Sequence, residues 1–118
     1  MNDSILKIDP NINESADFLR ARWKNQKPTT ALICGSGWAN ISSGLTIIDE
    51  ISYVEIKCLS KTTVDGHLSK LLLVKTSENF AVIFLGRRHY YEGVGWGPIA
   101  KPLFLCHEIG CKNLILTN

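Results

Sequence analysis

The sequence lacks a long apolar run and lacks an excess of charge of either sign. Its apolar stretches, such as Phe80 to Leu85, are far shorter than the roughly 20 residues that a membrane-spanning helix needs. The 13 basic and 11 acidic side chains leave a formal net charge of +2. So small an excess provides no basic surface for nucleic acid or for an anionic membrane. We therefore expect neither a membrane nor a nucleic acid as a partner.

The sequence also lacks a secretion signal and a cysteine motif of a metal site. Residues 1–4 are polar and acidic, with no apolar segment after a basic start, so we expect a cytoplasmic protein. The 4 cysteines contain no Cys-x-x-Cys pair. They are Cys34, Cys58, Cys106 and Cys111. We expect them to be reduced thiols that pack as small apolar side chains, and we expect no bound metal.

What the sequence does contain is an alternation of helical and extended patterns. A helix capped at residues 13–15 is expected to bury Ile12, Ala16, Leu19 and Trp23, which recur at helical spacing. A second helix is expected to begin at Pro98 and to end at Gly110. Residues 70–75 and 80–85 predict a hairpin, because four polar residues connect them. Further extended segments are expected at 30–34, 46–51, 52–56 and 113–117.

This alternation predicts one α/β domain over residues 1–118, with a mixed β-sheet flanked by helices. The last extended segment, 113–117, is apolar on both faces, which is typical of a central strand. In a chain that stops at Asn118, we expect this strand to leave an unpaired edge.

A dense polar cluster directly follows the predicted strand 80–85. It contains Arg87, His89, Tyr91 and Glu92. Open α/β sheets present ligand-binding groups at the carboxyl ends of their strands. An Arg fork beside a His suits an oxyanion such as phosphate, whereas Tyr and Glu suit a hydroxylated partner such as a sugar. The cluster therefore predicts a site where phosphate and ribose meet, although one of the adjacent Arg87 and Arg88 is expected to be a solvated charge.

Two further segments have the character of phosphate-binding loops. The apolar run 30–34 ends in Gly35, Ser36 and Gly37, where backbone N–H groups and a hydroxyl can face an anion. This loop lacks the Lys of a P-loop and the third Gly of a dinucleotide fingerprint. A turn at 62–67 ends in His67. Taken alone, Ser36 could simply cap a turn, and His67 could be an ordinary turn residue.

The order of these motifs resembles the trimeric purine nucleoside phosphorylases and the related methylthioadenosine phosphorylases. The resemblance extends from about Thr30 to the end of the chain, in the segments 33–37, 53–56, 64–67, 86–93 and 116–118. It implies the phosphorolysis of 6-oxopurine nucleosides, such as inosine and guanosine, to a free base and ribose 1-phosphate. It also implies a homotrimer.

The resemblance assigns a role to each matching residue. It implies that Ser36, His67, Arg87 and His89 bind phosphate. It implies that Tyr91 contacts ribose and that Asn118 approaches the nucleoside. It also implies that His89 and Glu92 are the catalytic residues, with Glu92 organising the site rather than transferring a proton. Inorganic phosphate would be the co-substrate, and no metal or organic cofactor is implied.

In the family, the Thr-Asn pair at 117–118 is followed by a Gly-rich segment and roughly as much chain again. We therefore expect this chain to be the N-terminal part of a phosphorylase, and we expect the isolated chain to be inactive. Two alternatives remain at this point. One is a non-catalytic truncated relative that binds phosphate or nucleoside, or that persists as an interaction remnant. The other is a methylthioadenosine phosphorylase.

Overall fold

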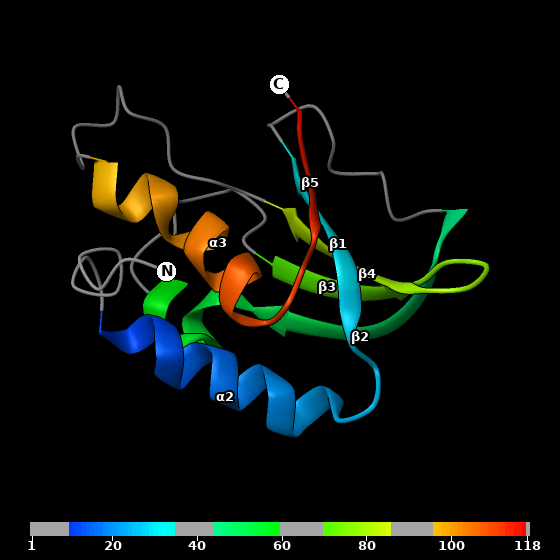
Figure 1. Cartoon of the computed structure of the whole chain (residues 1–118), viewed down its shortest axis with the longest axis horizontal. Coiled ribbons are helices and arrows are strands. Elements are labelled where there is room, and N and C mark those ends of the chain that lie inside the picture. The colour runs from blue at the N-terminus through cyan, green and yellow to red at the C-terminus, as the bar shows by residue number, and fades with distance from the viewer. Residues whose placement is uncertain (1–9, 35–43, 60–69, 86–95, 118) are drawn as a thin grey trace.

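The computed structural model of the chain describes residues 10–34, 44–59, 70–85 and 96–117 (Figure 1). The predicted α/β class with a mixed sheet is confirmed. In chain order the elements are α2 (Asn11–Trp23), β1 (Pro28–Cys34), β2 (Thr46–Ser52), the 3₁₀ turns η3 (Tyr53–Glu55) and η4 (Lys57–Leu59), β3 (Lys70–Lys75), β4 (Phe80–Leu85), α3 (Trp96–Glu108) and β5 (Asn113–Leu116).

The sheet has five strands in the order β2-β3-β4-β1-β5. Strand β1 pairs in parallel with β4 on one side and with β5 on the other. Strand β3 pairs antiparallel with both β2 and β4. The predicted hairpin of β3 and β4 is confirmed, and Thr76 closes its turn by donating its backbone N–H to the carbonyl of Asn79 at 2.8 Å.

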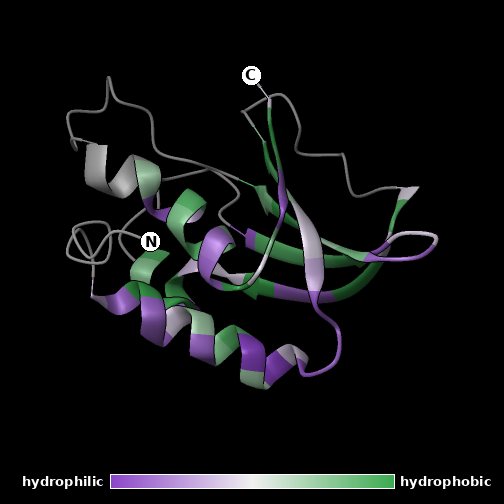
Figure 2. Ribbon diagram, viewed as in Figure 1, coloured by the Kyte–Doolittle hydropathy of each residue, from purple (hydrophilic) through white to green (hydrophobic). Residues whose placement is uncertain are grey.

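The main core lies between the sheet and the helices. Helices α2 and α3 lie beside the sheet (Figure 1). Residues of both helices and of the strands form one buried cluster. Strand β4 and the middle of β3 are strongly hydrophobic, whereas α2 carries many hydrophilic residues (Figure 2). The helical face predicted from spacing is confirmed, because Ile12, Ala16, Leu19 and Trp23 are all buried in this cluster. A second, smaller cluster centres on Leu72, Ile83 and Leu85.

The predicted starting points of both helices are wrong. Helix α2 begins at Asn11, after Pro10, so residues 13–15 lie inside the helix. The hydroxyl of Ser15 is buried and accepts the backbone N–H of Cys58 at 2.9 Å, so it is used for tertiary packing. Helix α3 begins at Trp96, two residues before Pro98, which is possible because the first turn of a helix needs no N–H donor. The predicted stop is confirmed, since Gly110 has a φ of +94°.

Strand β5 lies at the edge of the described sheet and exposes three large apolar side chains. Leu114, Ile115 and Leu116 are 46%, 52% and 57% exposed. Among the described strands, β5 pairs with β1 alone. The expected unpaired edge is therefore present in the part of the chain that the structure describes. An exposed apolar strand edge is a template for pairing with another chain.

We predict that the purified 118-residue chain self-associates through β5. Ile115→Lys should shift the population towards monomer, because a lysine on an edge strand opposes strand pairing. Light scattering and size-exclusion chromatography measure the change. Val54→Lys is the matched control, since Val54 is an exposed apolar residue in η3, outside the sheet. A monodisperse monomer of the unmodified chain would contradict the prediction.

Candidate functional site

One edge of the sheet collects the ends of several strands. The last residue of β1, Cys34, is the register partner of the last residue of β4, Leu85. In the antiparallel hairpin, Leu85 is opposite Lys70, the first residue of β3, and Lys70 is opposite Ser52, the last residue of β2. On the far side of β1, the N–H of Thr117 donates to the carbonyl of Ile33 at 3.0 Å. We call this row the carboxyl edge: β1, β2, β4 and β5 end there, and the antiparallel β3 begins there. It lies across the strand ends and is distinct from the outer strand β5.

The predicted site residues themselves lie outside the described residues. They are Ser36, His67, Arg87, His89, Tyr91, Glu92 and Asn118. The structure does place the described residues that are nearest in sequence to three of them. Ser36 comes two positions after Cys34, Arg87 two after Leu85, and His67 three before Lys70. These three anchor residues are consecutive neighbours across the sheet, where strands lie about 4.8 Å apart.

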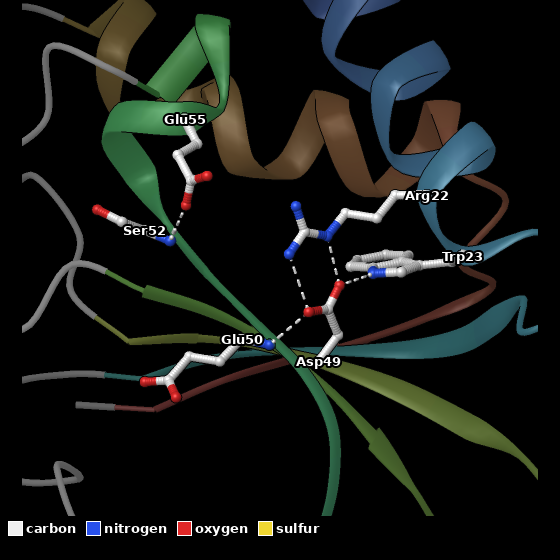
Figure 3. A network of polar contacts seen from close by, with 6 residues as sticks. All are labelled: Arg22, Trp23, Asp49, Glu50, Ser52 and Glu55. Carbon is white, nitrogen blue, oxygen red and sulfur yellow. Dashed lines mark hydrogen bonds and ion pairs between the residues drawn. The ribbon is translucent and has the colours of Figure 1, made fainter.

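The described part of the carboxyl edge is held by local polar contacts. A capping box joins β2 to η3: the Ser52 hydroxyl accepts the N–H of Val54, and the Glu55 carboxylate accepts the N–H of Ser52 at 3.3 Å (Figure 3). The ammonium of Lys70 lies 2.6 Å from the carboxylate of Glu50. Both side chains of this ion pair are exposed, at 41% and 48%, so the pair contributes little to stability.

A second polar network fastens α2 to the sheet (Figure 3). The Asp49 carboxylate accepts two hydrogen bonds from the Arg22 guanidinium, at 2.6 and 3.1 Å, and one from the Trp23 indole at 2.9 Å. The backbone N–H of Glu50 donates to the same carboxylate at 2.9 Å. Hydrogen bonding from Arg22 lowers the pKa of Asp49 below its ordinary value, against a smaller opposing effect of desolvation. This network supports the fold, because it joins α2 to β2.

The importance of Asp49 is missed by sequence reasoning, because its orientation depends on a bulge. The pairing of β2 with β3 shifts between Ile47 and Asp49, which leaves Ile48 as an extra residue. A bulge changes which residues of a strand face the core. After the bulge, Asp49 alternates in phase with the buried Ile51 and reaches the helices. No feature of the sequence marks Ile48 as the bulged residue.

Three further observations concern the part of the chain that the structure describes. Within those ranges, no group of three or more His, Cys, Asp or Glu side chains could hold a metal ion. No helix in the described part of the chain is both long and apolar enough to cross a membrane. A cavity of about 490 Å³ lies between the ends of α2 and α3, next to the first residue of β1. It is therefore at the opposite end of β1 from the carboxyl edge.

Comparison with known proteins gives a consistent result. Purine nucleoside phosphorylase from Rattus norvegicus is 33% identical over 104 residues, which is 88% of this chain and 36% of the relative. The enzyme from Anopheles gambiae is 34% identical over 107 residues, covering 91% of this chain and 30% of the relative. The resemblance to purine nucleoside phosphorylases is confirmed. The chain spans about a third of the length of these curated relatives.

Solved structures agree with the sequence comparison. Purine nucleoside phosphorylase from Schistosoma mansoni in complex with acetate has a TM-score of 0.77 and 29% identity, covering 92% of this chain and 40% of that protein. A Schistosoma mansoni purine nucleoside phosphorylase in complex with inosine has a TM-score of 0.76 and 28% identity, covering 92% of this chain and 38% of that protein. No family model matches the sequence. The described sheet and helices are therefore those of a part of the nucleoside phosphorylase fold.

Proposed function

We propose that this chain belongs to a purine nucleoside phosphorylase, a pentosyltransferase that cleaves 6-oxopurine nucleosides with inorganic phosphate. The products are a free base, such as hypoxanthine or guanine, and ribose 1-phosphate. The observation that carries the proposal is the match to enzymes of that name over nine-tenths of the chain. Because the match covers only about a third of those enzymes, the rest of the catalytic machinery would come from residues outside this chain.

The phosphate site of this proposal is built from Ser36, His67, Arg87 and His89. It is supported by the anchor residues at the carboxyl edge, since Cys34, Leu85 and Lys70 are neighbours across the sheet. A chain advances at most about 3.5 Å per residue. Ser36, Arg87 and His67 are two or three residues from their anchors, so each of them stays close to its own anchor residue. Segments far apart in the sequence would thus contribute donors to one anion.

In the proposed reaction, phosphate attacks the anomeric carbon as the glycosidic bond to the purine breaks. The ribose develops positive oxocarbenium character, which the negative phosphate stabilises while Arg87 and His89 hold it in place. Tyr91 would contact the ribose and Asn118 the nucleoside, and Glu92 would organise the site. The purine leaves with the electron pair of the broken bond and is stabilised by a hydrogen bond at N7, from residues beyond Asn118. We propose no metal and no organic cofactor.

We also propose that the enzyme is cytoplasmic and acts as a homotrimer. Both proposals rest on the family resemblance. Of the two alternatives, methylthioadenosine phosphorylase is disfavoured by the names of the relatives, which are purine nucleoside phosphorylases. A non-catalytic remnant is the alternative that the short coverage supports.

The deciding experiment measures hypoxanthine release from inosine by the full-length natural protein, with and without phosphate. We expect phosphate-dependent release, and we expect none from the 118-residue chain even where circular dichroism shows it to be folded. Cleavage of methylthioadenosine in place of inosine would show the sister activity. No cleavage of either nucleoside by the full-length protein would support the non-catalytic remnant. Turnover by the short chain would show that no further residues are needed.

A further inference from the structure

Two cysteines flank the turn that ends helix α3. Gly110, in the left-handed conformation, lets the chain reverse, so the N–H of Cys111 donates to the carbonyl of Cys106 at 3.0 Å. The N–H of Gly110 donates to the carbonyl of His107 at 3.1 Å. This pair of hydrogen bonds is the Schellman arrangement, in which the side chains at the positions of Cys106 and Cys111 typically contact each other.

The two thiols differ in exposure and interact directly. Cys106 is 4% exposed, whereas Cys111 is partly exposed. A hydrogen bond between the two sulfur groups lowers the pKa of Cys111, and together with burial it raises the pKa of Cys106. When protonated, the Cys111 thiol donates to the backbone carbonyl of Pro28, with 3.8 Å between sulfur and oxygen. Cys111 is the more exposed of the two sulfurs, so an oxidant in solvent reaches it first, while it packs against the buried cluster that contains Cys106.

A small oxidant can approach this turn from solvent. Pro28, Ile109 and Gly110 line the cavity of about 490 Å³ between the ends of α2 and α3. These residues are the hydrogen-bond acceptor of Cys111 and the two residues that precede it. A peroxide is only slightly larger than water, which takes up about 30 Å³ in the liquid. The cavity is therefore large enough to admit such a molecule beside the residues that adjoin Cys111, although Cys111 itself does not line it.

We propose that Cys106 and Cys111 are a redox-modification site at which a hydroperoxide forms an intramolecular disulfide. The Cys111 thiolate attacks the peroxide oxygen, breaks the O–O bond and becomes a sulfenic acid, and hydroxide takes up a proton to leave as water. The Cys106 sulfur then attacks the Cys111 sulfur and displaces hydroxide. That hydroxide leaves as water with the proton of Cys106. Two thiols and one hydrogen peroxide give one disulfide and two waters.

The other two cysteines are placed differently. Cys34 is buried in the smaller cluster on β1, and Cys58 is buried among the helices and 3₁₀ turns. The proposal therefore predicts selective oxidation. It gives Cys106 and Cys111 a reactivity beyond the structural role expected from the sequence, although all four cysteines are free thiols in this structure.

Peptide mapping after mild treatment with hydrogen peroxide tests the proposal on the folded protein. Remaining thiols are alkylated in denaturant, and the protein is digested with trypsin. Trypsin does not cut between Lys101 and Pro102, so residues 89–112 form one peptide that contains both cysteines. Cys34 and Cys58 fall on the separate peptides 25–57 and 58–61. We expect peptide 89–112 to lose two hydrogens and to take up no alkyl group, before the other two cysteines react.

Controls test whether the selective cross-link depends on the folded structure or only on the short separation of Cys106 and Cys111 in the sequence. Cys111→Ser and Cys106→Ser should both abolish the cross-link, whereas Cys34→Ser should retain it. In urea, the preference for the pair over Cys34 and Cys58 should fall by roughly tenfold, because burial then no longer distinguishes the four thiols. Mapping of the unmodified protein decides the matter even if a variant fails to fold. Oxidation of Cys34 or Cys58 first, or the same preference in urea, would overturn the proposal.

Discussion

Arg87→Gln in the full-length protein should lower kcat/KM for phosphate by about 100-fold, whereas Arg88→Gln should change it by less than about threefold. A guanidinium holds phosphate through two parallel charged hydrogen bonds, and a neutral amide supplies neither the charge nor the fork. Glutamine retains most of the length of the side chain, so the lost charge dominates the effect.

The adjacent Arg88 makes this comparison a matched one. Both arginines follow Leu85, which the structure fixes opposite Cys34 at the carboxyl edge. In an extended segment, neighbouring side chains point to opposite sides, so only one of the two can face the anion. Steady-state kinetics with phosphate varied at saturating inosine gives both values. Equal losses in the two variants would contradict the assignment of Arg87, and a larger loss for Arg88→Gln would reverse it.

Asp49→Ala should reduce the free energy of unfolding by about 2–3 kcal/mol, because it removes the acceptor of a partly buried network. The indole N–H of Trp23 would lose its acceptor at a site with little access to water, since Trp23 is buried. Arg22 would lose both of its hydrogen bonds to the carboxylate. Urea unfolding followed by tryptophan fluorescence measures the change.

Asp17→Ala is the matched control for this loss. Asp17 also pairs with an arginine, at 2.8 Å from Arg20, but its side chain is 77% exposed. Exposed pairs of this kind contribute little, so the change should stay within about 0.5 kcal/mol. If the two substitutions destabilise the protein equally, the Asp49 network contributes no more than a surface ion pair.

The effect of Asp49→Ala should also depend on pH. The pKa of Asp49 is lower in the folded protein than in the unfolded chain. Its contribution to stability is therefore fully present above the unfolded pKa of about 4, and it is lost as the pH falls through the lower folded pKa. The stability difference between the unmodified protein and Asp49→Ala should be largest near neutral pH and smaller at about pH 3. An equal difference at both pH values would contradict an ionised Asp49.

The sequence alone determined the locations of most strands and the class of the fold. The apolar runs at 70–75 and 80–85 with a four-residue connection specify a hairpin, because local patterning and a short loop suffice for one. The buried face of α2 follows from helical spacing. The first residue of α2 does not follow from the sequence. Ser15 looks like a helix cap, but its hydroxyl accepts a hydrogen bond from Cys58, 43 positions away, and no local pattern reveals that partner. The family resemblance likewise follows from the order of short motifs along the chain, which is a property of the sequence.

Only the tertiary structure decided which of these segments meet. Cys34 and Leu85 are far apart in the chain, and their register comes from the parallel pairing of β1 with β4. Asp49 reaches the helices because of a bulge at Ile48. Cys106 and Cys111 would point away from each other on a continuous helix, and the left-handed Gly110 brings them together. Sequence patterns report the preferences of nearby residues, whereas contacts between distant segments depend on the packing of the whole chain.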